Sequence, residues 1–218
     1  MSRFLSLLIF ITLGTWASAQ KPMAFSAHVD PQFGWFTSDE EDVLPGGTLF
    51  HLQAGLDMDY FFAPNYALSL GLGITNLGGG LIYNDSISLL SKSDTLWVAG
   101  GRDIKHQLQY IEIPLGIKLK TEELGYTTFY LKAGFTPMVR INAFASTDDK
   151  RLDKEDIEAS TPLFNLGYHI GAGVEYTLGG STALVGGFRW SAGLTDVTGN
   201  DLANVNYRLF SVQIGLIF

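Results

Sequence analysis

The sequence predicts an all-β fold: an eight-stranded antiparallel up-and-down transmembrane β-barrel, preceded by a cleaved signal peptide. Apolar and polar residues alternate with period two through eight segments, which is the pattern of strands with two different faces. The 218-residue chain combines 25 glycines and 13% aromatic residues with only 17% charged residues. Short and long connections alternate between the segments, as they do in outer-membrane barrels.

The first residues predict an export signal. Arg3 is followed by an apolar stretch over residues 4–15 and then by Ala17-Ser18-Ala19, a small-x-small cleavage pattern. We therefore expect a signal peptide over residues 1–19 and a barrel domain over residues 20–218. The alternative, a retained membrane anchor, is disfavoured because the apolar stretch is shorter than the roughly 20 residues that a transmembrane helix needs.

Each of the eight segments has one apolar face, and its other face carries polar and charged residues among glycines. In chain order the apolar rows are Phe25, Ala27, Val29, Phe33 and Trp35; Phe50, Leu52, Ala54, Leu56, Met58, Tyr60 and Phe62; Tyr66, Leu68, Leu70, Leu72 and Ile74; Ile111, Ile113, Leu115, Ile117 and Leu119; Phe129, Leu131, Ala133, Phe135, Val139 and Ile141; Tyr168, Ile170, Ala172, Val174 and Tyr176; Leu184, Phe188, Trp190 and Leu194; and Phe210, Val212, Ile214, Leu216 and Phe218. Each row is long enough for a tilted strand to cross a bilayer.

The connections predict the orientation of the barrel. Short turns are expected at residues 63–65, 121–125 and 178–181, and longer loops at residues 37–46, 78–107, 145–162 and 195–204. Outer-membrane barrels keep short turns in the periplasm and long loops outside. We therefore expect a bacterial outer-membrane protein with both termini in the periplasm.

A soluble calyx similar to a lipocalin is the structural alternative, and it would place the apolar faces inside. The many glycines on the polar faces favour the membrane barrel, because strands approach closely in a small barrel interior. Aromatic residues support it as well, since they gather toward the two ends of the segments, as in the aromatic girdles of membrane barrels. The expected girdles are Phe33, Trp35, Phe50, Tyr168 and Trp190 at one rim, and Tyr60, Phe62, Tyr66, Phe129, Tyr176 and Phe218 at the other.

Charged residues on the inward faces predict a filled lumen. The acids are Asp30, Asp57, Asp59, Glu112 and Glu175, and the bases are Lys118, Lys120, Lys132, Arg140 and Arg189. Because isolated charges in a narrow interior are costly, this balance indicates mutual ion pairing. An eight-stranded barrel is just wide enough for its own side chains, so an open diffusion pore is not expected. The alternative is a narrow channel for small solutes.

The remaining composition excludes several functions. There is no cysteine, which rules out disulfides, cysteine metal sites and thiol catalysis. A net charge of −8 and a pI near 4.8 make nucleic acid an unsuitable partner. The expected loops are acidic, for example at Asp39 to Asp42; we interpret them as a solvated face, with divalent-cation binding as the alternative. No spacing typical of a calcium loop is present, and we expect no metal or cofactor.

The sequence does not predict an enzyme. His28, His51 and His169 fall on inward strand positions, where hydrogen-bonded lumen residues are expected. His106 falls at the end of the second expected loop, after the serines Ser86, Ser88, Ser91 and Ser93, and no nucleophile-elbow motif accompanies it. A lipid-modifying enzyme of the outer membrane is the third functional alternative, after an accessory barrel and a narrow channel.

One stretch carries a family resemblance. Residues Tyr110-Ile111-Glu112-Ile113-Pro114-Leu115-Gly116-Ile117-Lys118, followed after a turn by Tyr130-Leu131-Lys132-Ala133-Gly134, resemble the PorT-like outer-membrane β-barrels. The resemblance implies an eight-stranded barrel and a link to the type IX secretion apparatus. The last segment, Phe210, Val212, Ile214, Leu216 and Phe218, resembles the signal that the barrel-assembly machinery recognises, which implies that machinery as a transient partner.

These observations favour a non-catalytic outer-membrane barrel that acts as a structural or accessory component of an outer-membrane assembly. Its expected partners are the lipids of the outer membrane and another outer-membrane or secretion protein.

Overall fold

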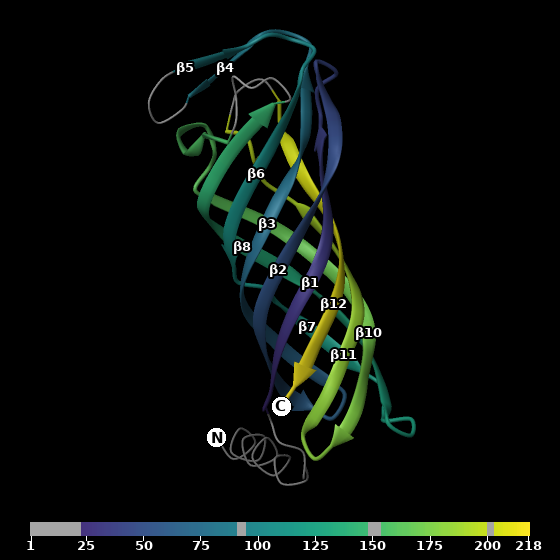
Figure 1. Ribbon diagram of the computed structural model, residues 1–218. Coiled ribbons are helices and arrows are strands. Elements are labelled where there is room, and N and C mark those ends of the chain that lie inside the picture. Colours follow the sequence, from purple (N-terminus) through teal and green to yellow (C-terminus); the bar gives the residue numbers. More distant parts are fainter. Residues whose placement is uncertain (1–22, 91–94, 148–153, 200–202) are drawn as a thin grey trace, which may run out of the picture.

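The computed structural model describes residues 23–90, 95–147, 154–199 and 203–218, and its main element is a closed antiparallel barrel (Figure 1). In the described residues the ring has eight strands, because β6 and β7 follow one another along the same strand of the wall. Their order around the ring is β1, β2, β3, β6–β7, β8, β10, β11 and β12. Pairing between β1 and β12 closes it. The eight-stranded fold predicted from alternation is thereby confirmed. The signal-peptide prediction over residues 1–19 lies outside the described residues.

The ring strands differ considerably in length. Their bounds are β1 Met23–Ser38, β2 Val43–Ala63, β3 Tyr66–Tyr83, β6 Asp103–Glu112, β7 Leu115–Lys120, β8 Thr127–Thr147, β10 Phe164–Gly179, β11 Thr182–Gly193 and β12 Val205–Ile217. Outside the ring, β4 Ile87–Leu90 pairs with β5 Thr95–Val98, β9 Glu155–Asp156 pairs with β8, and a single 3-10 turn η1 spans Glu158–Ser160. No helix in the described residues has the length and apolarity to span a membrane.

The two ends of the barrel have different connections. At the turn end, β2–β3, β7–β8 and β10–β11 are joined by residues 64–65, 121–126 and 180–181. At the loop end, longer connections follow β3, β8 and β11, and the β4–β5 hairpin projects from the barrel (Figure 1). The C-terminal end of β12 lies at the turn end, beside the first described residues of β1.

The outward faces form an apolar belt around the turn-end half of the barrel. Leu56, Leu72, Phe135, Phe188 and Ile214 each expose 59–60% of their surface, although all are large and apolar. Aromatic rings pair near both edges of this belt: Phe33 with Phe50 and Trp35 with Trp190 toward the loop end, Phe62 with Tyr66 and Tyr126 with Tyr176 toward the turn end. The alternating rows thus face outward, and the soluble-calyx alternative, which needs them inside, is wrong.

The strands continue beyond the belt toward the loop end, which corrects the loop boundaries expected from the sequence. β1 runs to Ser38 and β2 starts at Val43, inside the expected loop 37–46. β3 extends to Tyr83 and β6 starts at Asp103, inside the expected loop 78–107, and β8 extends to Thr147. In these extensions the polarity of the two faces is reversed: on β6, Ile104 and Leu108 are buried inside while Gln107 is exposed outside. The loop-end half is therefore built like a soluble barrel with an apolar core.

This core closes the loop end, and we call it the apolar plug. Its buried residues are Phe36, Val43, Leu77, Leu81, Tyr83, Ile87, Val98, Ile104, Leu108, Tyr110, Met138, Ala143, Ala145, Ile157, Val197, Ala203, Val205, Tyr207 and Leu209. Among its most completely buried members, Tyr110, Tyr207 and Phe36 are the largest, and none of the three exposes more than 2% of its surface. Buried aromatic and aliphatic side chains therefore occupy the lumen at this end, as they do in a protein interior.

Close backbone approach narrows the loop end further. A Cβ on Gly79 would lie 2.9 Å from the Phe36 backbone nitrogen and 3.0 Å from Trp35 Cα, so β1 and β3 touch here. A Cβ on Gly34 would lie 2.8 Å from the Gly78 carbonyl oxygen. Only glycine, which has no Cβ, allows this contact.

Residues 110–118 and 130–134 have structural roles in the wall. Ile113 and Pro114 interrupt the strand between β6 and β7, because proline cannot donate to the ladder, yet the register against β3 and β8 is unchanged across the break. Gly116 and Gly134 face each other in the β7–β8 pair. A Cβ on Gly134 would lie 2.0 Å from the Leu115 carbonyl oxygen.

Gly134→Ala should therefore lower the free energy of unfolding by about 1–3 kcal/mol, because the added methyl group forces β7 and β8 apart. Urea titration of the barrel in detergent micelles measures this loss. Gly186→Ala on β11 is the matched control, since its Cβ would meet no atom within 4 Å. Equal stability of the two variants would contradict the close contact.

Candidate functional site

The candidate site is the turn-end half of the lumen, where strand alternation points polar side chains inward. The layer of charged residues nearest the turn end surrounds Lys118 of β7. The Lys118 Nζ lies 2.6 Å from Asp59 Oδ2 and 2.7 Å from Glu175 Oε1, and Lys120 Nζ lies 2.5 Å from Glu175 Oε2. Ser69 also donates to Asp59 over 2.6 Å. Two acids and two bases from three strands, β2, β7 and β10, therefore neutralise one another.

A second layer lies closer to the plug. Lys132 Nζ donates to Asp57 Oδ2 over 2.8 Å, and the His28 Nδ1 lies 3.0 Å from Asp30 Oδ1. Arg189 and Gln53 both contact Glu112, and Arg189 also donates to the Gln53 side-chain oxygen. All of these side chains are buried. Ionised groups at this depth are tolerated in a protein interior because each has a partner of opposite charge or a hydrogen bond.

Arg140 does not join this network. It lies at a register irregularity between β6 and β8, where Tyr110 pairs with Arg140 but Gln109 pairs with Asn142. Its guanidinium is half-buried and donates to the backbone oxygen of Glu158 in η1. The extra residue of β8 lies between Arg140 and Asn142, so Arg140 still follows the parity of Lys132 and pairs with Tyr110. It lies beyond the charged layers, where its guanidinium reaches η1 and supports the loop end.

The four histidines have different surroundings. His28 is hydrogen bonded to Asp30, and the His169 Nδ1 lies 2.9 Å from Thr136 Oγ1. His51 is half-buried beside Gly78 at the bottom of the plug. His106, expected in a loop, is a buried residue of β6 instead. Its Nδ1 lies 3.1 Å from the Ile104 carbonyl oxygen, and its ring meets the Phe36 ring edge-on.

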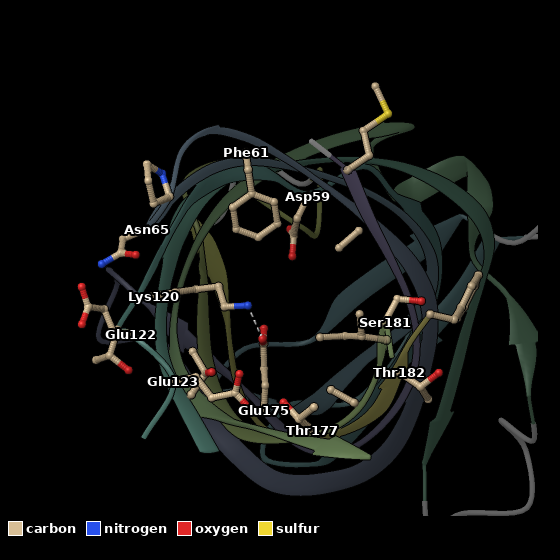
Figure 2. A pocket seen from close by; sticks show the side chains of 18 of the residues that line it. Asp59, Phe61, Asn65, Lys120, Glu122, Glu123, Glu175, Thr177, Ser181 and Thr182 are labelled. Carbon is tan, nitrogen blue, oxygen red and sulfur yellow. Dashed lines mark ion pairs between the residues drawn. The ribbon is translucent and has the colours of Figure 1, made fainter. Parts of the chain in front are cut away.

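The turn end opens into a cavity of about 860 Å³, which we call the mouth (Figure 2). The Lys120–Glu175 pair lies near its centre, and the Lys120 Nζ stands 5.3 Å from the centroid of the Phe61 ring. Glu122 and Glu123 of the β7–β8 turn lie at its rim and are exposed. The charged layers form the floor of the mouth, and the plug lies beyond them.

Sequence reasoning missed the apolar plug, although a signal was present. From Ile104 to Tyr110 the apolar residues still alternate, but they occupy the positions that are polar in the belt. The same reversal occurs in β12, where Tyr207 and Leu209 are buried while Phe210 faces outward. The point at which apolar residues move from the outward to the inward positions of a strand marks where that strand leaves an apolar environment.

Within the residues that the structure describes, no group of three or more His, Cys, Asp or Glu side chains is arranged to hold a metal ion. The acidic stretch Asp39 to Asp42 is exposed. One of its carboxylates, on Asp39, accepts a hydrogen bond from the Asn204 backbone.

Burial of His106 makes the loop end sensitive to acid. His106 lies beyond the apolar belt, and desolvation lowers the pKa of its imidazole from about 6.5 to about 4, while the Ile104 carbonyl raises it slightly. The folded state therefore binds fewer protons than the unfolded state between these values, and stability falls as the pH falls from 6.5 toward 4.

We expect the stability advantage of the wild type over His106→Leu to shrink by up to about 3 kcal/mol between pH 7.5 and pH 4. Urea titrations of both proteins at pH 7.5, 5.5 and 4 measure this difference. Parallel pH curves for the two proteins would show that His106 is not buried in its neutral form.

Comparisons with known proteins agree with this architecture. The chain belongs to the outer membrane protein beta-barrel domain family, whose model matches residues 11–199. It is therefore a β-barrel protein of the bacterial outer membrane, and its apolar belt faces lipid. No protein of curated function matches the sequence.

Several solved structures of outer-membrane barrels are similar. Neisserial surface protein A is 15% identical, with 89% of this chain and 97% of that chain covered and a TM-score of 0.49. OprG from Pseudomonas aeruginosa is 10% identical, with 91% and 96% covered and a TM-score of 0.47. The outer membrane protease OmpT from Escherichia coli is 9% identical, with 94% and 99% covered and a TM-score of 0.44.

Proposed function

We propose that this protein is a non-conducting, non-catalytic barrel that serves as an accessory component of an outer-membrane assembly. The observation that carries the proposal is the closure of the lumen. The plug fills its loop-end half, and paired charges fill the layers beneath it. A barrel closed in this way offers surfaces to partners rather than a route for solutes.

The side-chain chemistry supports a non-catalytic role. Nucleophilic catalysis by serine needs a hydroxyl, a base and an orienting carboxylate in hydrogen-bond succession. Among the described residues, His106 is enclosed in the plug, whereas Ser86 and Ser88 are exposed. The His169 Nδ1 contacts the Thr136 hydroxyl, but the buried Nε2 of this imidazole has no hydrogen-bond partner, so no carboxylate orients the ring.

We place the turn end in the periplasm and the long loops outside, because outer-membrane barrels keep their short turns on the periplasmic side. The mouth then faces the periplasm. Its rim exposes Glu122 and Glu123 beside Leu124 and Tyr126, a mixture of charge and apolar surface that suits a protein partner. The resemblance of residues 110–118 and 130–134 to the PorT-like barrels supports a secretion-related assembly such as the type IX apparatus.

The C-terminal strand supports transient recognition by the barrel-assembly machinery. Phe210, Ile214, Leu216 and Phe218 all expose large apolar side chains on the outer wall. Such a row is available to another protein before lipid covers it.

Affinity purification from native outer membranes in mild detergent tests the accessory role. We expect a stoichiometric partner with the wild-type barrel and its loss with Glu122→Lys/Glu123→Lys at the mouth. Glu40→Lys/Glu41→Lys, at the loop end, is the matched control and should retain the partner. Recovery of the barrel alone at monomer mass, from membranes in which it is abundant, would contradict a stable accessory role.

A further inference from the structure

The mouth has an acidic rim on one side. Glu122 and Glu123, which follow β7, are exposed there (Figure 2). In the described chain Lys120 is the one base that lines the mouth, and its ammonium pairs with Glu175. The two rim carboxylates therefore have no base among the lining residues to neutralise them. Their potential draws cationic groups to this side of the mouth.

The opposite side of the mouth is apolar and is built from small side chains. β7 and β12 lie four positions apart in the ring of eight strands, so they face each other across the lumen. Ile217 of β12, Ala183 of β11 and Ala24 of β1 pack in one apolar cluster and line the mouth. Because alanine side chains are short, they leave the cavity open against this wall.

We propose that the mouth binds an extended segment of the partner protein. One apolar side chain of the segment lies against Ala24, Ala183 and Ile217, and a lysine or arginine reaches Glu122 and Glu123. The proposal rests on the accessory role proposed above, which supplies the partner, and it specifies the chemistry of the contact.

The geometry of the mouth favours an extended chain as its occupant. Successive side chains of an extended chain point to opposite sides, and the mouth offers opposite chemistries on its opposite sides. Its volume of about 860 Å³ is typical of a binding pocket. The Lys120–Glu175 pair and the charged layers close the floor, so the segment enters from the turn end and stops there.

Methyl NMR of the folded barrel in detergent micelles, with ¹³C-labelled alanine methyl groups, tests the site with short peptides. The probe peptide has leucine followed by lysine within a glycine frame. The two comparison peptides have serine in place of leucine, or glutamate in place of lysine. We expect saturable shifts of the Ala24 and Ala183 methyl signals with the leucine–lysine peptide and about tenfold weaker binding of either comparison peptide. The outward Ala54 methyl should not shift, which excludes simple uptake of the peptide by the micelle.

Two variants test the two sides of the mouth separately. Glu122→Gln/Glu123→Gln should weaken binding of the leucine–lysine peptide and remove its dependence on salt. Ala183→Phe fills the space at the apolar wall and should abolish the advantage of leucine over serine. Thr127→Phe is the matched control, because Thr127 lies beside the mouth-lining Thr128 but on the outer face, and it should leave binding unchanged.

Equal affinity for the leucine and serine peptides, or unchanged binding by Ala183→Phe, would overturn the proposal and leave only an acidic rim. The absence of saturable shifts at both alanines would also overturn it, even if a partner co-purifies with the wild-type barrel and the accessory role stands. Peptide binding without any co-purifying partner would contradict the accessory role alone. Ala24→Phe replaces Ala183→Phe if the latter does not fold, and heat-modified migration on gels reports folding for each variant.

Discussion

Lys118→Met is expected to lower the free energy of unfolding by about 3–5 kcal/mol, because it removes one partner from a buried ion-pair group. Lys118 contacts both Asp59 and Glu175, and the three side chains are almost completely enclosed. After the substitution, two buried carboxylates share the single cation of Lys120. Urea titration in detergent micelles, followed by the gel shift between folded and unfolded barrel, measures the loss.

Two further variants separate this mechanism from general damage to the barrel. Lys118→Met/Asp59→Asn leaves the neutral pair of Lys120 and Glu175, so it should recover most of the lost stability, a coupling that a double-mutant cycle measures. Lys154→Met, at an exposed lysine of the loop end, should change stability by less than about 0.5 kcal/mol. A double variant no more stable than Lys118→Met would show that the charges act independently.

Phe36→Ala is expected to cost about 3–5 kcal/mol as well, for a different reason: it leaves a cavity in the apolar plug. Phe36 exposes only 1% of its surface and packs against His106 and the β3 backbone at Gly79. The loss of stability should be concentrated at the loop end. Amide hydrogen exchange should therefore accelerate more in the loop-end part of β6 than in the turn-end part of β7.

Phe164→Ala is the control for Phe36→Ala. Phe164 is also near the loop end, but it exposes 68% of its surface, so its removal should have little effect on the unfolding free energy. If the two variants unfold at the same urea concentration, the plug does not contribute the packing that its burial indicates.

The membrane-crossing part of this fold could be predicted from the sequence because one rule governs it. Where the outside is lipid and the inside is polar, each strand shows apolar residues at every second position, as from Tyr66 to Ile74. Strand number, short turns and outward faces all follow from this rule, and the structure agrees with them.

The loop-end half could not be predicted by the same rule because its environment is different. Beyond the belt the outside is water, so Leu108 and Tyr110 turn inward and Gln107 and Gln109 face outward. Because the apolar residues of these strands do not lie on the outward positions, the rule for the membrane-crossing part assigns the strands to loops. The bulge at Arg140 is a second such case, since one extra residue changes which side chains point inward and no sequence pattern marks it.

The partners within the lumen also depend on information that alternation does not contain. Inward positions identify Lys118 and Glu175 as lumen residues, but they are 57 positions apart, and strand stagger decides that they meet. The same stagger places Lys132 against Asp57, whereas Arg140 donates to the backbone oxygen of Glu158. Charge balance can be counted from the sequence, whereas pairing requires the three-dimensional register.

Single-channel recording tests the closed lumen most directly. The purified barrel, with folding verified by gel shift, is reconstituted into a planar lipid bilayer beside a porin prepared in the same way. We predict no stepwise conductance from the barrel at either polarity, because the plug and the paired charges block the lumen. Reproducible conductance steps that scale with the amount of folded barrel would contradict the closed lumen and favour a narrow solute channel.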